Sequence, residues 1–269
     1  MSQMKRVFSW LGRRKGGPEM HRFRCNICGA KNREPTSEFG RERPSCKRCH
    51  STVRMRSIIH VLSTELFGRS LAVSDFPSRP DLHGLGMSDW DEYASRLATK
   101  LGYQNTFYDT EPRLNILDPA PELVGTLDFL ISTDVFEHVA PPVQAAFDRT
   151  FELLKPGGVF VFSVPHTRDE NTVEHFPELH DYRIEERESG PVLLNVTADG
   201  RQQVFEDLVF HGGPGETLEM RVFCLDALRE HFAASGFGPP TIYEENAPSC
   251  GMIWEGNLSL TMGVRKPAC

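Results

Sequence analysis

The sequence predicts an α/β fold with a mostly parallel central sheet, and three observations support this. A strand–helix–strand unit lies mid-chain, with apolar runs at 129–132 and 159–164 on either side of a helical pattern at 143–154. Two buried strands joined by a helix form a right-handed crossover between parallel strands. Further short apolar runs alternate with helical patterns along the chain. Two CxxC pairs near the N-terminus indicate a small additional metal module.

The first 56 residues are strongly basic and the remainder is acidic. Residues 1–56 carry a formal charge of +11 and residues 57–269 carry −18, which gives the net −7. A basic N-terminal segment followed by an acidic remainder is typical of a protein with a polyanionic partner such as nucleic acid. The alternative, which we favour, is that a tiny metal module exposes Arg and Lys because it has little other surface.

Cysteine usage and hydropathy predict a cytoplasmic protein without a membrane span. Four of the seven cysteines form the CxxC pairs, as expected of a metal site in a reducing compartment. No run of eighteen apolar residues occurs. Residues 1–20 form a basic segment, either a short helix or a frayed tail, whose apolar run at 7–11 is too short for a signal-peptide core. The sequence predicts no oligomeric state.

Residues 21–57 are predicted to form a zinc-ribbon module. Two CxxC pairs separated by seventeen residues suit a tetrahedral Zn²⁺ site in which each pair closes a tight turn. Four protein ligands leave no open position, so this zinc is expected to be structural. The predicted ligands are Cys25, Cys28, Cys46 and Cys49. A helix is predicted to follow, beginning at Thr52 and ending at Gly68.

The remaining elements complete the predicted sheet. Strands are expected at 71–74, 105–109 and 114–118, with a helix at 90–102. A polar, histidine-rich insertion at about 166–222 contains the hairpin signal Asp199-Gly200 and is expected to form a lid or substrate wall. A helix at 223–237 and an antiparallel pair at 240–243 and 257–264 end the chain.

The mid-chain unit also resembles a known family. Asp128-Phe-Leu-Ile-Ser132, Glu137-His138-Val139, Leu154-Lys-Pro-Gly-Gly158 and Val164-Pro165 resemble, in order and spacing, the Rossmann-like S-adenosylmethionine (SAM) methyltransferases. The resemblance implies a seven-stranded, mostly parallel sheet flanked by helices over residues 58–269. It also implies SAM as cofactor, in addition to structural Zn²⁺.

The resemblance places cofactor contacts at the ends of successive strands. An acid after the second strand would bind the ribose, where Asp109 and Glu111 compete, and Asp118 would lie near the adenine unless it is an ordinary turn acid. The first loop departs from the family because no glycine pattern follows residue 74; the nearest glycines, Gly84 and Gly86, come ten residues later. The predicted cofactor-binding residues are Ser74, Asp75, Asp109, Glu111, Asp118, Asp134 and Glu137.

The predicted function is SAM-dependent O-methylation of a small molecule or glycan hydroxyl. His138 and His166 are the candidate bases, with Asp134 and Glu137 as orienting groups. Glu137 equally suits a helix cap, which leaves its role open. The insertion's histidines resemble no metal motif, and we interpret them as hydrogen-bonding residues. They are His166, His175, His180 and His211.

Two alternatives remain open at this point. One is an RNA methyltransferase whose basic ribbon contacts phosphates, with Lys47, Arg48, Arg54 and Arg56 as the contacts. The other is a binding or scaffold protein whose altered first loop no longer holds the cofactor.

Overall fold

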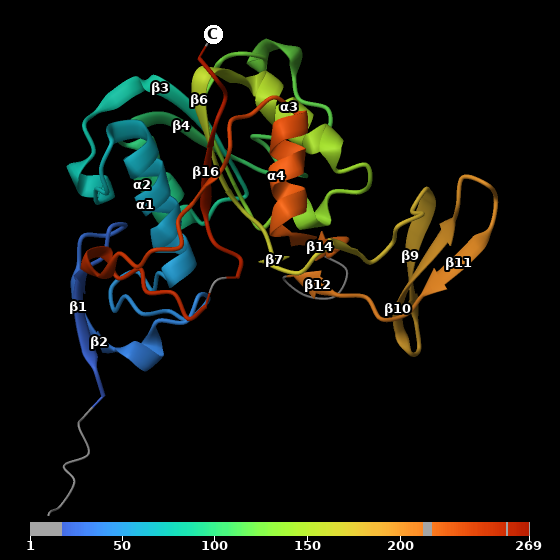
Figure 1. Ribbon diagram of the computed structural model, residues 1–269, viewed down its shortest axis with the longest axis horizontal. Coiled ribbons are helices and arrows are strands. Elements are labelled where there is room, and N and C mark those ends of the chain that lie inside the picture. The colour runs from blue at the N-terminus through green and yellow to red at the C-terminus, as the bar shows by residue number, and fades with distance from the viewer. Residues whose placement is uncertain (1–17, 212–216, 257, 269) are drawn as a thin grey trace, which may run out of the picture.

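A computed structural model describes residues 18–211, 217–256 and 258–268. Within them the central sheet has six strands in the order β15-β16-β6-β5-β3-β4 (Figure 1). Neighbours are parallel from β4 to β6, and β16 and β15 are antiparallel, as expected for the end of the chain. The strands are β3 (Arg79–Met87), β4 (Leu101–Thr106), β5 (Leu127–Thr133), β6 (Leu154–Ser163), β15 (Thr241–Ile242) and β16 (Met262–Arg265). The mostly parallel α/β prediction is confirmed.

Helices cover both faces of this sheet. α1 (Val53–Phe67) and α2 (Asp91–Ala98) pack on one face, against side chains that include Phe129 and Val161. α3 (Gln144–Leu153) and α4 (Leu225–Ala234) pack on the other face, against Leu130 and Phe162 (Figure 1). Because successive residues of a strand point to opposite faces, β5 and β6 supply both cores with near-continuous apolar sequence.

The first strand of the sheet is β3, so the prediction of a strand at 71–74 is wrong. Val73–Asp75 form a 3₁₀ turn whose Val73 N–H donates to Asn26 O at 2.8 Å. The sequence pattern did not indicate this strand because it contains glycines. Neighbouring aromatic rings leave no space for a larger side chain at these positions. A Cβ on Gly84 would lie 2.2 Å from the Phe129 ring, and Tyr103 stacks on that ring at 6.1 Å.

The predicted third strand at 114–118 is also wrong. In the described residues this segment forms turns, with a single isolated bridge between Phe107 and Arg113. Asp118 N–H donates to Asn115 O at 3.0 Å, which closes a local turn instead of a sheet ladder. The central sheet therefore has six strands in the described part of the chain instead of the expected seven.

The N-terminal part contains the hairpin β1 (Met20–Arg24) and β2 (Lys31–Pro35), which leads to α1. The Thr52 hydroxyl accepts the Met55 N–H at 3.4 Å, and Gly68 ends the helix at φ +71°, as predicted. Residues 1–17 of the predicted basic segment lie outside the described residues. No helix in the described ranges is long and apolar enough to cross a membrane.

The predicted insertion forms several small sheets. Its hairpin around Asp199-Gly200 is confirmed and extends into a three-stranded arm of β9 (Asp181–Arg187), β10 (Gly190–Val196) and β11 (Gln202–Phe205), which projects from the body (Figure 1). The shorter strands are β7 (His166–Thr167), β8 (Val173–Glu174), β12 (Phe210–His211), β13 (Thr217–Leu218) and β14 (Arg221–Cys224). Residues 212–216 are not described.

Candidate active site and cysteine cluster

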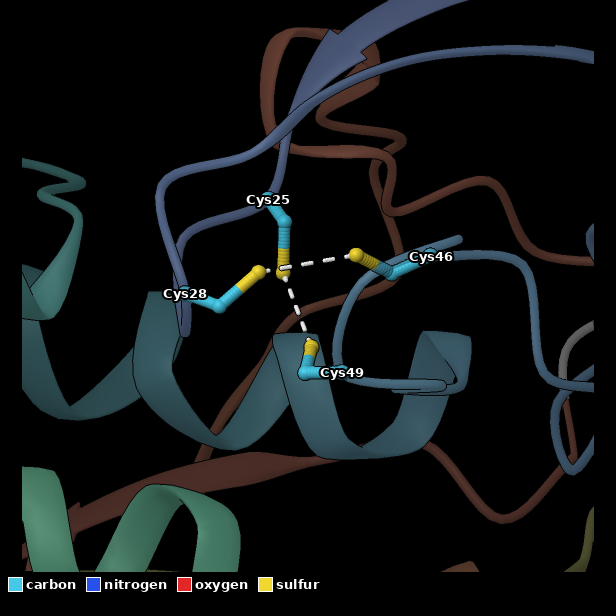
Figure 2. Close-up of side chains that lie close together, drawn as sticks. All are labelled: Cys25, Cys28, Cys46 and Cys49. Carbon is cyan, nitrogen blue, oxygen red and sulfur yellow. Dashed lines mark hydrogen bonds between the residues drawn. The ribbon is translucent and has the colours of Figure 1, made fainter.

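Four cysteine sulfurs converge at the N-terminal hairpin (Figure 2). The Sγ atoms of Cys25 and Cys49 are 3.7 Å apart, and those of Cys28 and Cys46 are 3.6 Å apart. Each pair closes a similar turn, in which the N–H of Gly29 donates to Cys25 O and that of His50 to Cys46 O. Sulfurs about 2.3 Å from one tetrahedral zinc would be about 3.8 Å apart. The four thiols therefore fit a Zn²⁺ ion.

The arginines after this cluster are held by the protein itself. The Arg56 guanidinium is fully buried and donates to Gly251 O at 2.8 Å and to Ser51 O at 2.6 Å. Arg54 pairs with Glu42, at 2.8 Å from its Nε. Because both cations are already satisfied within the chain, the phosphate-contact role suggested for them in an RNA methyltransferase lacks support.

A cavity of about 1410 Å³ opens at the carboxyl ends of the parallel strands. Met87 and Ser88 line it from the end of β3, Thr106 and Phe107 from the end of β4, and Thr133 from the end of β5. Ligands of parallel α/β sheets bind at this edge. The remaining wall includes the segment 114–117, Tyr182 and Ile184 of the arm, and Arg41 and Arg54 from the N-terminal part.

Asp134 lies in the turn after β5, at φ +56°. Its carboxylate accepts hydrogen bonds from Arg41 at 2.9 Å and from Ser163 at 3.1 Å, and Arg54 Nε lies 3.3 Å away. Burial by itself would raise the pKa of Asp134, but the two arginines hold that pKa below its usual value. Asp134 is therefore a fixed negative charge in the cavity wall.

A second cluster lies beside Asp134 on the 3₁₀ turn Phe136–His138. The Glu137 carboxylate is fully buried, and neither oxygen has a hydrogen-bond partner among the described residues. Its Oε1 lies 3.6 Å from His138 Nε2 and 3.7 Å from His211 Nδ1. Burial raises the pKa of Glu137 to about 7, and His211 opposes the rise. Since the Glu137 side chain caps no helix, the helix-cap interpretation is wrong.

The Arg221 side chain holds the turn Phe136–His138 in place. Its guanidinium is fully buried, pairs with Glu174 at 2.7 Å, and donates to Val139 O at 2.6 Å and Phe136 O at 3.1 Å. These bonds satisfy carbonyls at both ends of the 3₁₀ turn, which therefore holds the Glu137 and His138 side chains in one orientation.

The structure brings some predicted site residues together and separates others. Asp134, Glu137 and His138 cluster at the cavity. Ser74 and Asp75 instead lie near the amino ends of β3 and β4: Lys100, directly before β4, donates to Ser74 O at 3.1 Å, and Arg24 holds the Asp75 carboxylate. Their predicted role as cofactor contacts rested on the misplaced first strand, and the structure gives it no support.

Two further groups of predicted residues do not line the cavity. Asp109, Glu111 and Asp118 lie in the loop after β4, where Glu111 accepts the Arg113 N–H at 3.0 Å. The cavity wall takes other residues of that loop, namely Phe107, Tyr108, Leu114, Asn115, Ile116 and Leu117. His166 is 2% exposed, lies in β7, and its Nδ1 is 3.2 Å from Val164 O.

Sequence reasoning missed residues that reach the cavity from distant segments. Arg41 comes from the loop between the two CxxC pairs, and Glu219 comes from the insertion. Neither belongs to a recognisable motif. The one available signal was the isolated acid Glu219 between apolar neighbours Leu218 and Met220, which is typical of a buried carboxylate with a partner.

Comparison with protein families identifies one matching domain in the chain. Residues 83–202, from β3 to the arm, match the family model described as a methyltransferase domain. The match covers less than half of the chain and shows that the segment from β3 to the arm is a methyltransferase domain. No characterised protein sequence matches it at a significant level.

Solved structures resemble this chain only distantly. A Burkholderia thailandensis 1,6-didemethyltoxoflavin-N1-methyltransferase with bound 1,6-didemethyltoxoflavin and S-adenosylhomocysteine is 16% identical, with 79% of this chain and 78% of that chain covered and a TM-score of 0.44. CalS10, an amino pentose methyltransferase from Micromonospora echinaspora, is 14% identical over 70% and 85% of the two chains, with a TM-score of 0.38. Similarities at this level say nothing about the substrate of this enzyme.

Proposed function

We propose that this methyltransferase binds SAM in the cavity at the ends of β3, β4 and β5 and methylates a hydroxyl group of a small molecule or glycan. The observation that carries the proposal is the position and size of the cavity. Its volume of about 1410 Å³ exceeds the roughly 300–1,000 Å³ that is typical of small-molecule pockets. It therefore has room for a cofactor and an acceptor together.

The residues at the cavity fit an adenosyl cofactor. Ser88 adopts φ +55° directly after β3, which turns the backbone where the family places its first loop. Apolar side chains of the next loop, Phe107 and Ile116, offer surface for an adenine ring, and Asn115 offers an amide. The structure moves the first loop from residue 74 to residues 88–90, directly after β3, and this loop also contains no glycine, so the departure from the family pattern remains.

SAM would supply an electrophilic methyl group on a sulfonium. The contribution of the protein is to align the acceptor with that group and to exclude water. His138 lines the cavity, and its Nδ1 lies 2.9 Å from Leu218 O, which leaves Nε2 as the free acceptor atom toward the Glu137 cluster. We propose that the acceptor hydroxyl binds at this cluster.

We also propose that the four cysteines bind a structural Zn²⁺ ion. The sulfur separations and the closed set of four thiols support this.

A matched pair of surface variants tests the cofactor site. Leu117 lines the cavity and is 39% exposed, whereas Val124 is 51% exposed and lies outside the lining. Leu117→Arg should weaken S-adenosylhomocysteine binding measured by calorimetry by at least about tenfold, because the new charge occupies an apolar wall. Val124→Arg should bind like the wild type. Equal affinity for both variants, or no binding by the wild type, would contradict the proposed site.

A further inference from the structure

Glu137 is a buried carboxylate without a counterion at hydrogen-bond distance. Its side chain is fully buried, and both oxygens lack hydrogen-bond partners among the described residues. Burying such a group without a partner costs several kcal/mol in general, so native proteins pair it with a cation or a donor. The two nearest polar atoms are imidazole nitrogens at 3.6 and 3.7 Å, too far for hydrogen bonds.

In each of the two imidazoles, the nitrogen that faces away from Glu137 lies at hydrogen-bond distance from an acceptor oxygen. His138 Nδ1 lies 2.9 Å from Leu218 O, and His211 Nε2 lies 3.0 Å from Glu219 Oε2. A carbonyl and a carboxylate only accept, so in the neutral imidazoles these nitrogens carry the protons and the other nitrogens keep their lone pairs. Those lone-pair nitrogens, His138 Nε2 and His211 Nδ1, are the atoms that face Glu137 Oε1.

This arrangement is typical of histidines that bind a metal. A metal-ligating histidine almost always donates its other N–H to a carbonyl or a carboxylate. Glu219 is held in turn by His175, whose Nε2 lies 3.0 Å from Glu219 Oε1. The His138 and His211 rings are perpendicular, at 88°, with centroids 4.8 Å apart. One ligand atom from each of Glu137, His138 and His211 lies within 4.8 Å of the other two.

The distances also fit a shared ion. Two ligand atoms that each lie about 2.1 Å from one ion are about 3.4 Å apart at a tetrahedral angle and about 3.6 Å apart at 120°. The observed 3.6 and 3.7 Å agree with such a geometry and do not agree with direct hydrogen bonds. Two histidines and one carboxylate form a donor set that divalent first-row metals bind with open positions.

We propose that Glu137, His138 and His211 bind a divalent transition-metal ion, distinct from the ion at the four cysteines. His138, His211 and Glu219 all line the cavity, so an open position of the ion would face it. If the proposed methyltransferase function holds, this position would take an oxygen atom of the acceptor, and a second open position beside it would favour acceptors whose hydroxyl is next to a second oxygen. The interpretation of the insertion's histidines as hydrogen-bonding residues would then be incomplete.

The test measures metal binding directly and needs neither SAM nor an acceptor. The full-length enzyme, with zinc retained at the cysteines, is dialysed against a weak chelator and titrated with Mn²⁺, which favours carboxylate and other oxygen ligands over thiolates. Calorimetry and the loss of the free Mn²⁺ resonance signal report the stoichiometry. One ion per chain is expected for the wild type.

Two variants and a control separate the site from other histidines. Glu137→Gln keeps the shape of the side chain but removes the charge, and His211→Gln removes a ligand; each should lower Mn²⁺ affinity by roughly 100-fold or more, above the 10–100-fold typical of losing an outer contact. His180→Gln, at an exposed position of the insertion, should bind like the wild type. Circular dichroism checks folding.

The proposal fails if the wild type binds no Mn²⁺, Co²⁺ or Zn²⁺ beyond the cysteine-bound ion, or if Glu137→Gln binds like the wild type. The outcome is independent of the proposed methyl transfer. An enzyme that binds S-adenosylhomocysteine without a second metal would refute only the metal site, and a metal-binding protein without cofactor affinity would refute only the methyltransferase proposal.

Discussion

Asp89, in the turn after β3, makes the stability of this protein dependent on pH. Its side chain is buried, and Oδ2 accepts the Tyr103 hydroxyl at 2.6 Å while Oδ1 has no partner among the described residues. Burial raises the pKa of Asp89 to about 7, although Tyr103, Tyr93 and Arg54 oppose the rise. The folded protein therefore keeps a proton here that the unfolded chain releases.

The sign of the effect follows from this difference in proton binding. Between the ordinary pKa of 3.8 and the folded value of about 7, the unfolded chain is ionised and the folded carboxyl is neutral. The free energy of unfolding therefore falls as pH rises through this window, by about 1.36 kcal/mol for each pH unit, and is constant above it. The full window corresponds to about 4 kcal/mol.

Asp89→Asn removes the titration and keeps an oxygen for the Tyr103 hydroxyl. The variant should therefore gain stability relative to the wild type as pH rises, by about 3 kcal/mol between pH 5 and pH 8. Urea unfolding of both proteins at four pH values measures this, because other titrating groups cancel in the difference. Tyr103→Phe removes a group that lowers the pKa of Asp89, so its stability should keep falling to higher pH. A pH-independent difference between Asp89→Asn and wild type would refute the reasoning.

Two further predictions concern packing. Gly84→Ala should destabilise the protein by about 1–3 kcal/mol or more in urea unfolding, because its Cβ would lie 2.2 Å from the Phe129 ring; unchanged stability would show that the ring can move. Arg56→Ala should cost roughly 3–5 kcal/mol, because it leaves buried acceptors such as Gly251 O unpaired, whereas Arg48→Ala at an exposed position should change stability by less than about 0.5 kcal/mol. Similar costs for both arginine variants would contradict the buried role of Arg56.

The elements that could be predicted from sequence are those whose local signals agree. The unit β5–α3–β6 combines buried apolar runs, an amphipathic helix and Gly157, whose positive φ lies in the irregular first part of β6, so pattern and propensity point to one structure. α1 was predicted to its ends because Thr52 and Gly68 are strong helix boundaries.

β3 could not be predicted because its sequence contradicts its structure locally. Residues 79–87 contain a proline and two glycines, which are depleted in strands. The need for glycine at these positions comes from residues later in the chain. Phe129 covers Gly84, and Asp89 and Tyr103 each have an atom 2.1 Å from where a Cβ of Gly86 would be. The sequence shows the glycines, but it does not show that aromatic rings from later segments pack against them.

The contact between the N-terminal part and the cavity could not be predicted from the sequence either, and it gives the N-terminal part a role at the site. Arg41 lies in the loop bounded by the two CxxC pairs, and Arg54 lies in the first turn of α1. The backbone of Arg54 donates to Arg41 O at 3.2 Å, and both side chains reach Asp134 after β5. Closing the cysteine cluster therefore fixes the segment that neutralises Asp134. The four-cysteine module is part of the cavity wall, and its positive charge has an intramolecular role at the site.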